Sequence, residues 1–167
     1  AGNWIPFSDL LHYSCTFQAY SAKLNDICTL QYTGGTTGAS KGVMLTNKTV
    51  LSNIAQSLAV LASREKSLEG ACTIAPLPMY HIYSYALCLG IIPALKGHSV
   101  LIPDPRNISA FISSIKHYKF DIFTGLNSLF VALMEHSKFK NLDFSKLRIT
   151  LSGGMALMES VAEDWQK

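Results

Sequence analysis

The sequence has little charge and lacks any cluster of basic residues. Charged side chains make up only 15% of its 167 residues, and the formal charge of +3 comes from 14 basic and 11 acidic side chains without a run of consecutive Lys or Arg. A nucleic-acid-binding surface needs basic residues gathered on one face, so the sequence predicts no nucleic-acid partner. Because 49% of the residues are hydrophobic, we expect a folded chain with a buried core rather than disorder.

Cysteine and histidine are too sparsely arranged to predict a metal centre. The four cysteines, Cys15, Cys28, Cys72 and Cys88, form no Cys-x-x-Cys pair and lie mostly in apolar segments. We therefore expect reduced, buried thiols, as in a cytoplasmic protein. The five histidines show neither His-x-His nor His-x-x-x-His spacing, which argues against a histidine metal triad.

No apolar stretch is long enough to cross a membrane. The longest, residues 82–95, has about 14 residues and contains Pro93, whereas a membrane-spanning helix needs roughly 20. We interpret this stretch as a buried helix. Peripheral contact with the inner membrane stays open.

Strand-like and helical patterns alternate from residue 26 onward. Short apolar runs predict strands at residues 26–32, 42–45, 71–75, 99–102, 120–123 and 147–151. Helical spacing between them favours an α/β fold with a mostly parallel, doubly wound sheet and helices on both faces. We expect residues 1–25 to form a loop and a short helix lying against the domain, and residues 26–167 to form part of the α/β domain itself.

The helix expected after residue 45 illustrates the pattern. Its apolar residues Val50, Ile54, Leu58 and Leu61 are spaced by four, four and three positions, which places them on one helical face. Thr46 or Asn47 can cap its first turn.

A glycine- and threonine-rich segment directly follows the first expected strand. Residues 32–42 read YTGGTTGASKG. Glycines allow backbone N–H groups to approach an anion, and threonine hydroxyls and the Lys41 ammonium add donors and charge. The segment is not a P-loop, because Lys41 follows Ser40 and precedes Gly42. It predicts a polyphosphate site at the tip of a parallel strand, with a plain flexible turn as the alternative.

TGGTTGASKG resembles the phosphate loop of the adenylate-forming (AMP-binding) superfamily, which includes acyl-CoA synthetases, peptide-synthetase adenylation domains and luciferases. The resemblance implies ATP as the ligand, Mg2+ close to Thr33, and stabilisation of pyrophosphate by Lys41. Ser40 stands where many members have proline. The phosphate-binding residues implied by position are Thr33, Gly34, Gly35, Thr36, Thr37, Gly38 and Lys41.

The segment PLPMYHIY at residues 76–83 resembles the family stretch in which a histidine lies beside the carboxylate substrate. By itself, a histidine next to an apolar helix is usually a structural residue. The resemblance instead implies that His81 belongs to the carboxylate pocket. Tyr83, with its neighbours Tyr80 and Tyr85, can either line the pocket or simply pack, and we favour packing.

Two further segments resemble family stretches near the acyl chain. TGLNSLF at residues 124–130 implies that Gly125 and Asn127 border the substrate pocket, although Asn127 could equally cap an ordinary helix. SGGMAL at residues 152–157 implies that Gly153 and Gly154 lie near adenine and that Gly154 and Met155 lie near the acyl chain. Bare glycine backbone lets a flat ring approach closely. A serine-hydrolase elbow is excluded at Ser152, because Thr150 stands where that motif needs glycine.

The sequences and the order of these motifs most resemble those of bacterial long-chain fatty acid:CoA ligases. The resemblance implies part of a larger acyl-CoA synthetase N-terminal domain, which joins a fatty acid to coenzyme A through an acyl-adenylate. Its partners would be fatty acid, ATP and coenzyme A, and a homodimer stays open. Family elements that follow these motifs are not in the sequence, so we expect the 167-residue chain alone to be inactive. The alternatives are a non-catalytic nucleotide- or anion-binding module and another adenylate-forming enzyme, such as a short-chain or aryl acid CoA ligase or an amino-acid adenylation domain.

Overall fold

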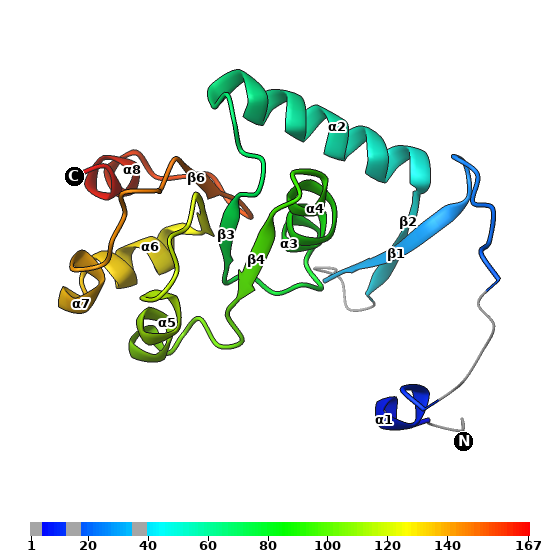
Figure 1. The fold of residues 1–167 in the computed structure, drawn as a ribbon, viewed down its shortest axis with the longest axis horizontal. Helices are drawn as coiled ribbons and strands as arrows, with labels where there is room; N and C mark the ends of the chain where they lie inside the picture. The colour runs from blue at the N-terminus through cyan, green and yellow to red at the C-terminus, as the bar shows by residue number, and fades with distance from the viewer. Residues whose placement is uncertain (1–4, 13–17, 35–39) are drawn as a thin grey trace.

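The computed structural model describes residues 5–12, 18–34 and 40–167. Its main body contains a four-stranded sheet whose strands all run parallel, in the spatial order β4-β3-β5-β6 (Figure 1). The strands are β3 (Cys72–Ala75), β4 (His98–Leu101), β5 (Ile122–Gly125) and β6 (Ile149–Ser152). The predicted α/β class with a mostly parallel sheet is confirmed.

Helices cover both faces of this sheet, as predicted for a doubly wound fold. The helical elements on one face are α2 (Asn47–Arg64), α3 (Ile82–Ala86), the π-helix η1 (Leu87–Ile91) and α4 (Ile92–Ala94). Those on the other face are α5 (Ile108–Ile115), α6 (Asn127–Met134), α7 (Ser137–Lys140) and α8 (Glu159–Trp165). The helix α7 is an addition to the predicted elements.

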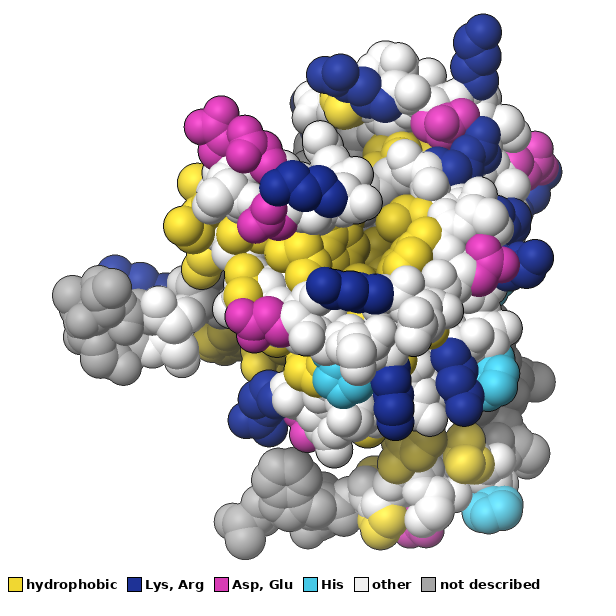
Figure 2. All heavy atoms as spheres, turned by 90° about the vertical axis from the view of Figure 1, so that its left-hand side faces the viewer, with side chains coloured by type: hydrophobic (Ala, Val, Ile, Leu, Met, Phe, Trp, Pro, Cys, Tyr) yellow, Lys and Arg dark blue, Asp and Glu magenta, His cyan; other side chains and the backbone are white. Residues whose placement is uncertain are grey.

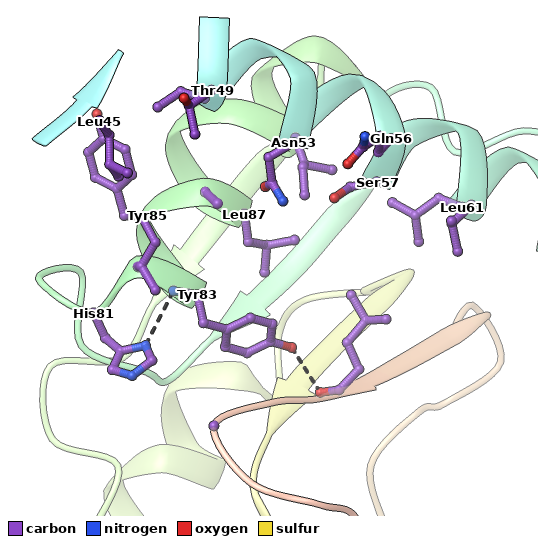
Figure 3. Close-up of a pocket in the computed structure, with 17 residues that line it drawn as sticks. Leu45, Thr49, Asn53, Gln56, Ser57, Leu61, His81, Tyr83, Tyr85 and Leu87 are labelled. Atoms are coloured by element: carbon purple, nitrogen blue, oxygen red, sulfur yellow. Dashed lines mark hydrogen bonds between the residues drawn. The ribbon is translucent and has the colours of Figure 1, made fainter. Parts of the chain in front are cut away.

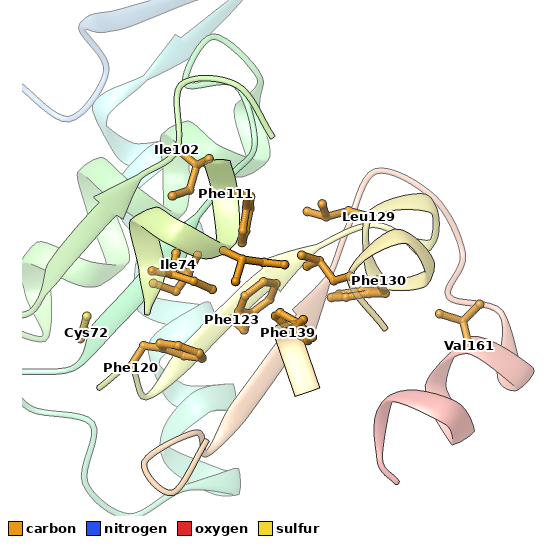
Figure 4. Packing of buried hydrophobic residues seen from close by; sticks show 13 residues of the cluster. Cys72, Ile74, Ile102, Phe111, Phe120, Phe123, Leu129, Phe130, Phe139 and Val161 are labelled. Carbon is orange, nitrogen blue, oxygen red and sulfur yellow. The ribbon is translucent and has the colours of Figure 1, made fainter. Parts of the chain in front are cut away.

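Alternate strand residues supply two separate cores, because successive side chains of a strand point to opposite faces. On β5, Phe123 packs in an aromatic core against Phe111 and Phe130, with ring centroids 6.0 and 6.3 Å apart (Figure 4). Its neighbour Ile122 is fully buried in the second core, with Leu87 of η1. Burial on both faces explains why the strands read as short continuous apolar runs.

The direction in which the chain adds strands reverses between β3 and β5. From β3 the chain passes through α3, η1 and α4 to β4 on one side, and then returns through α5 to β5 on the other side of β3. In open α/β sheets, ligands bind outside the carboxyl ends of the strands at such a reversal. The segments after β3, β5 and β6 therefore meet where a ligand site is expected.

The glycine-rich segment does not lie at the tip of a parallel strand, and in this respect the prediction was wrong. The strands β1 (Ile27–Thr33) and β2 (Lys41–Thr46) form a separate antiparallel pair, in which Thr33 pairs with Lys41. Residues 34–40 are too few for the crossover of about a dozen residues that joins parallel strands. The segment therefore closes a hairpin.

The helix after this hairpin forms as predicted. The Thr46 Oγ1 atom accepts the backbone N–H of Thr49 at 3.2 Å and caps α2. Ile54, Leu58 and Leu61 pack against the second core, so the apolar face read from the sequence is the buried one.

The single helix predicted over residues 82–95 is divided into three parts. Between α3 and α4 the chain makes the π-helical turn η1, where the Ile92 N–H bonds to the Leu87 carbonyl five residues back. Pro93 lies in α4; it has no N–H and its ring crowds the carbonyl four residues back. The wider turn accommodates this interruption.

The first segment and the cysteines differ in part from expectation. A short helix, α1 (Phe7–Leu10), forms as predicted, but all four of its residues are exposed although we expected the segment to lie against the domain. Cys72 and Cys88 are buried thiols as predicted, whereas Cys28 is exposed and Cys15 lies outside the described residues. Within the described part of the chain, no helix combines the length and the apolar character that crossing a membrane requires.

Candidate functional site

The segments after β5 and β6 are joined at the carboxyl edge of the sheet. The Gly153 N–H donates to the Gly125 carbonyl at 3.2 Å, immediately beyond the paired ends of the two strands. Gly154 follows with a φ of +81°, a backbone conformation that favours glycine. The structure thus brings together Gly125, Gly153 and Gly154, which the sequence predicts as site residues.

Tyr83 connects this edge to the helix that begins at His81. Its hydroxyl donates to the Leu151 carbonyl at 3.2 Å, and a Cβ atom on Gly153 would lie 2.9 Å from its ring. Burial, with a smaller contribution from the nearby Cys88 thiol, raises the pKa of Tyr83 to about 12. Tyr83 therefore packs, as favoured, and its ring requires the absence of a side chain at Gly153. Tyr83 and Tyr85 also line the groove described below, and packing is wrong for Tyr80, which is 81% exposed.

His81 is the N-cap residue of α3. Its Nδ1 atom accepts the Tyr83 N–H at 3.2 Å (Figure 3). In the neutral ring the proton is consequently on Nε2, because Nδ1 uses its lone pair in the cap. The side chain is exposed, so Nε2–H can donate to an oxygen of a ligand.

Asn127 does not cap α6, which begins after Leu126 without a side-chain cap. Its Nδ2 donates to the Ala156 carbonyl at 2.9 Å, and its Oδ1 accepts the Met158 N–H at 3.1 Å. The alternative of an ordinary capping residue is therefore wrong. The buried Asn127 side chain instead fixes the turn that follows β6.

A groove of about 750 Å3 runs along α2, between this helix and α3 and η1 (Figure 3). Its wall is mostly apolar, and His81, Tyr83 and Gly154 contribute to it. Gly125, Asn127 and Met155, also predicted for the substrate pocket, are not among its lining residues. The groove is lined by Leu45, Thr49, Val50, Asn53, Gln56, Ser57, Val60, Leu61, His81, Ile82, Tyr83, Tyr85, Ala86, Leu87, Ile91, Leu151 and Gly154.

The contribution of α2 to this groove was missed by the sequence reasoning. Thr49, Asn53, Gln56 and Val60 follow helical spacing beside the buried face of α2. This second stripe could have been found as a mixed polar and apolar face at i, i+4, i+7 and i+11. Its position beside Leu151 and Gly154 could not have been predicted, because α2 is far from these residues in the sequence.

The hairpin β1-β2 is bonded to the segment that carries His81. Gln31 Nε2 donates to the Tyr80 carbonyl at 2.8 Å, and the hydroxyls of Thr29 and Tyr85 lie 2.8 Å apart. The backbone ends of the glycine-rich segment are thereby held on the same side of the molecule as His81.

Only part of the predicted phosphate-binding set belongs to the described residues. Thr33, Gly34 and Lys41 are exposed at the loop end of the hairpin. The other four predicted residues lie outside the described residues: Gly35, Thr36, Thr37 and Gly38. Residues 5–12, 18–34 and 40–167 contain no group of three His, Cys, Asp or Glu side chains able to hold a metal ion.

A second cavity of about 300 Å3 lies on the other face of β6, against α8. Trp165 Nε1 donates to Thr150 Oγ1 at 2.9 Å beside it, and Ser152 Oγ is buried there with no hydrogen-bond partner among the described residues. Figure 2 shows this side of the molecule, where hydrophobic side chains fill a hollow surrounded by basic and acidic ones. None of the predicted site residues lines this cavity.

The chain matches known proteins over nearly its whole length. The family model described as AMP-binding enzyme matches residues 6–167. A long-chain-fatty-acid–CoA ligase of Escherichia coli O6:H1 is 38% identical over 168 residues, covering 98% of this chain and 29% of the ligase. The ligase of the same name from Yersinia pestis is 40% identical over 141 residues, covering 84% of this chain and 25% of the ligase.

Among solved structures, an anthranilate CoA ligase in complex with anthranoyl-AMP superposes with a TM-score of 0.77 at 25% identity, covering 90% of this chain and 29% of that one. The chain therefore spans between a quarter and three tenths of the length of these relatives.

Proposed function

The chain belongs to the AMP-binding enzyme family, and on this premise we propose that it is part of an ATP-dependent long-chain fatty acid:CoA ligase. The observation that carries the proposal is the apolar groove along α2, to which His81 and Gly154 contribute. An apolar groove suits a hydrocarbon chain, and a few polar groups suffice to orient its polar end. Relatives named long-chain-fatty-acid–CoA ligase support the same substrate class.

In this proposal the fatty acid lies with its carboxylate at His81 and its hydrocarbon chain along α2. His81 Nε2–H donates to a carboxylate oxygen, because Nδ1 is engaged by the Tyr83 N–H. The groove extends along α2 from Thr49 to Leu61. Twelve helical steps correspond to about 18 Å, which is long enough for an extended long-chain acyl group.

ATP then binds with its phosphates at the glycine-rich segment. The bonds from Gln31 and Thr29 to the His81 region hold the hairpin beside the carboxylate. The carboxylate oxygen attacks the α-phosphorus and forms a new P–O bond, while the bond to the β-phosphate breaks and pyrophosphate leaves. Lys41 supplies positive charge to the leaving oxygens, and the chain's contribution is positioning and electrostatic stabilisation.

The Thr33 hydroxyl is the group that would contact Mg2+. Magnesium usually keeps several waters and binds through substrate phosphates and few protein groups, so a single exposed hydroxyl at the hairpin end fits a metal carried in by ATP. When bound, the ion neutralises phosphate charge.

In the second half-reaction, the thiol of coenzyme A displaces AMP from the acyl-adenylate, giving acyl-CoA.

A matched pair of variants tests the role of His81 in the full-length protein. His136 caps α7 through the same bond, since its Nδ1 accepts the Lys138 N–H at 3.3 Å, but it lies away from the groove. Replacing His81 by alanine should lower kcat/KM for palmitate-dependent pyrophosphate release about 10- to 100-fold, because a hydrogen bond to a charged group is lost. His136→Ala should leave this kcat/KM close to that of the unaltered protein.

Equal activities in the two variants would contradict the carboxylate assignment. A full-length protein that binds ATP but releases no pyrophosphate with any carboxylic acid would instead support the non-catalytic nucleotide-binding module.

A further inference from the structure

The helix α2 and the π-helix η1 are in close contact at a glycine. A Cβ atom on Gly90 would lie 2.5 Å from Ile54 Cδ1 and 2.7 Å from Ile54 Cγ1. Carbon atoms in contact normally lie about 3.5–4.0 Å apart. The observed separation of the two helices therefore depends on the absence of a side chain at position 90.

Rotation of the Ile54 side chain does not relieve this contact. Ile54 lies within the continuous helix α2, where a β-branched side chain has one strongly preferred χ1. The position of Cγ1 is set by χ1 alone, so changing χ2 moves only Cδ1. A methyl group at Gly90 must consequently push α2 and η1 apart.

These same two elements form the walls of the groove. Val50 and Ser57 of α2 face it from one side, and Leu87 and Ile91 of η1 from the other. Gly90 and Ile54 are not among its lining residues, so they would not touch a ligand. Their contact lies between the two elements that form the walls.

We propose that the Gly90–Ile54 contact determines the width of the acyl groove and restricts it to slender, unbranched acyl chains. The inference rests on the proposed function, because it assigns the groove to the acyl group. Gly90 is a positioning residue: it acts through the spacing of α2 and η1. A wider groove would admit methyl-branched or phenyl-bearing chains and would hold a straight chain less closely.

Full-length protein carrying Gly90→Ala, with and without Ile54→Ala, tests the proposal. The measurement is kcat/KM for palmitate and for a methyl-branched acid of the same chain length, and the result is their ratio. Gly90→Ala should raise the branched-to-straight ratio about tenfold, at the lower end of what one methylene-sized change contributes in an apolar site. Adding Ile54→Ala removes Cγ1 and Cδ1, so the ratio should return to within about twofold of the unaltered enzyme.

An unchanged ratio in folded Gly90→Ala, or a ratio that Ile54→Ala does not restore, would overturn the proposal. If Gly90→Ala does not fold, Ile54→Val tests the proposal instead, because it removes only Cδ1 and lets the two helices move closer. The branched-to-straight ratio of kcat/KM should then fall about threefold. An unchanged ratio refutes the assignment of groove width to this contact. An unaltered full-length protein that activates neither acid rejects the proposed function and this inference together. Activity with both acids and no effect of the variants rejects this inference alone.

Discussion

His81 is oriented by the helix that it begins. Its Nδ1 accepts the Tyr83 N–H, and its carbonyl accepts the Tyr85 N–H at 2.9 Å. Tyr83 in turn packs on Gly153 and donates its hydroxyl to the Leu151 carbonyl. One histidine, which alone predicts little, is thus held in a single orientation by the residues around it. The sequence was enough to identify His81 and its motif. The tautomer of its ring could be assigned only from the geometry of the helix cap.

Tyr83 should titrate far above an ordinary tyrosine. Its folded pKa is raised to about 12 from 10.0, so burial of the neutral phenol contributes stability that is fully present below pH 10 and lost as the pH rises toward 12. Tyrosinate absorbance of the unaltered chain minus that of Tyr83→Phe should show a midpoint near 12. A difference curve centred near 10 would mean that the ring is solvated and does not pack on Gly153.

Lys41→Ala in the full-length protein should reduce turnover much more than fatty acid binding. Its ammonium lies at the exposed end of the hairpin, opposite Thr33, where it can act on phosphate but not on hydrocarbon. We expect kcat to fall about 100- to 1,000-fold, as for the loss of one electrostatic stabiliser, while the Kd for palmitate stays within about twofold. Turnover that is unchanged, or a loss confined to palmitate binding, would refute the phosphate assignment.

At the scale of elements, local patterns predicted what local forces decide. The cap at Thr46 and the apolar face of α2 were read correctly because both depend on neighbours within one or two turns. The strands β1 and β2 were wrongly predicted to belong to the parallel sheet, because the residue pattern of a strand does not determine which strand it pairs with. The π-turn η1 was missed because Pro93 changes the hydrogen-bond ladder without changing the apolar run.

The turn after β6 should loosen when its asparagine bridge is removed. Asn127→Ala deletes the bonds to Ala156 and Met158, which should cost roughly 1–3 kcal/mol of stability and increase hydrogen exchange in residues 153–158. Asn107→Ala is the matched control: it removes the cap of α5, where Oδ1 accepts the Ala110 N–H at 3.0 Å, at about 1 kcal/mol. Equal exchange in residues 153–158 of the two variants would show that Asn127 does not hold the turn.

At the scale of the whole molecule, the sheet order explains why separate motifs form one site. Because the strand succession reverses between β3 and β5, the segments carrying His81, Gly125 and Gly153 emerge at one edge. The carboxyl-end rule accounts for this gathering once the strand order is known. The sequence did not predict that α2 forms a wall of the groove, since contacts between distant helices leave no local pattern.

The 167-residue chain by itself should not form acyl-adenylate. It spans between a quarter and three tenths of the length of the relatives described above, and among its described residues only Thr33 is assigned to the metal. With ATP, Mg2+ and palmitate, we expect no acid-dependent pyrophosphate release from the isolated chain, measured against the full-length protein under the same conditions. Release at a comparable rate would show that the described groove and hairpin suffice for the first step.

The proposed placement of the acyl chain along α2 can be tested by a crystal structure of the full-length protein with a non-hydrolysable palmitoyl-adenylate analogue. We expect hydrocarbon density between α2 and η1, with the acyl carbonyl near His81 Nε2 and the phosphate toward the hairpin end that carries Thr33 and Lys41. Hydrocarbon density in any other part of the molecule, with the groove along α2 left empty, would contradict this placement.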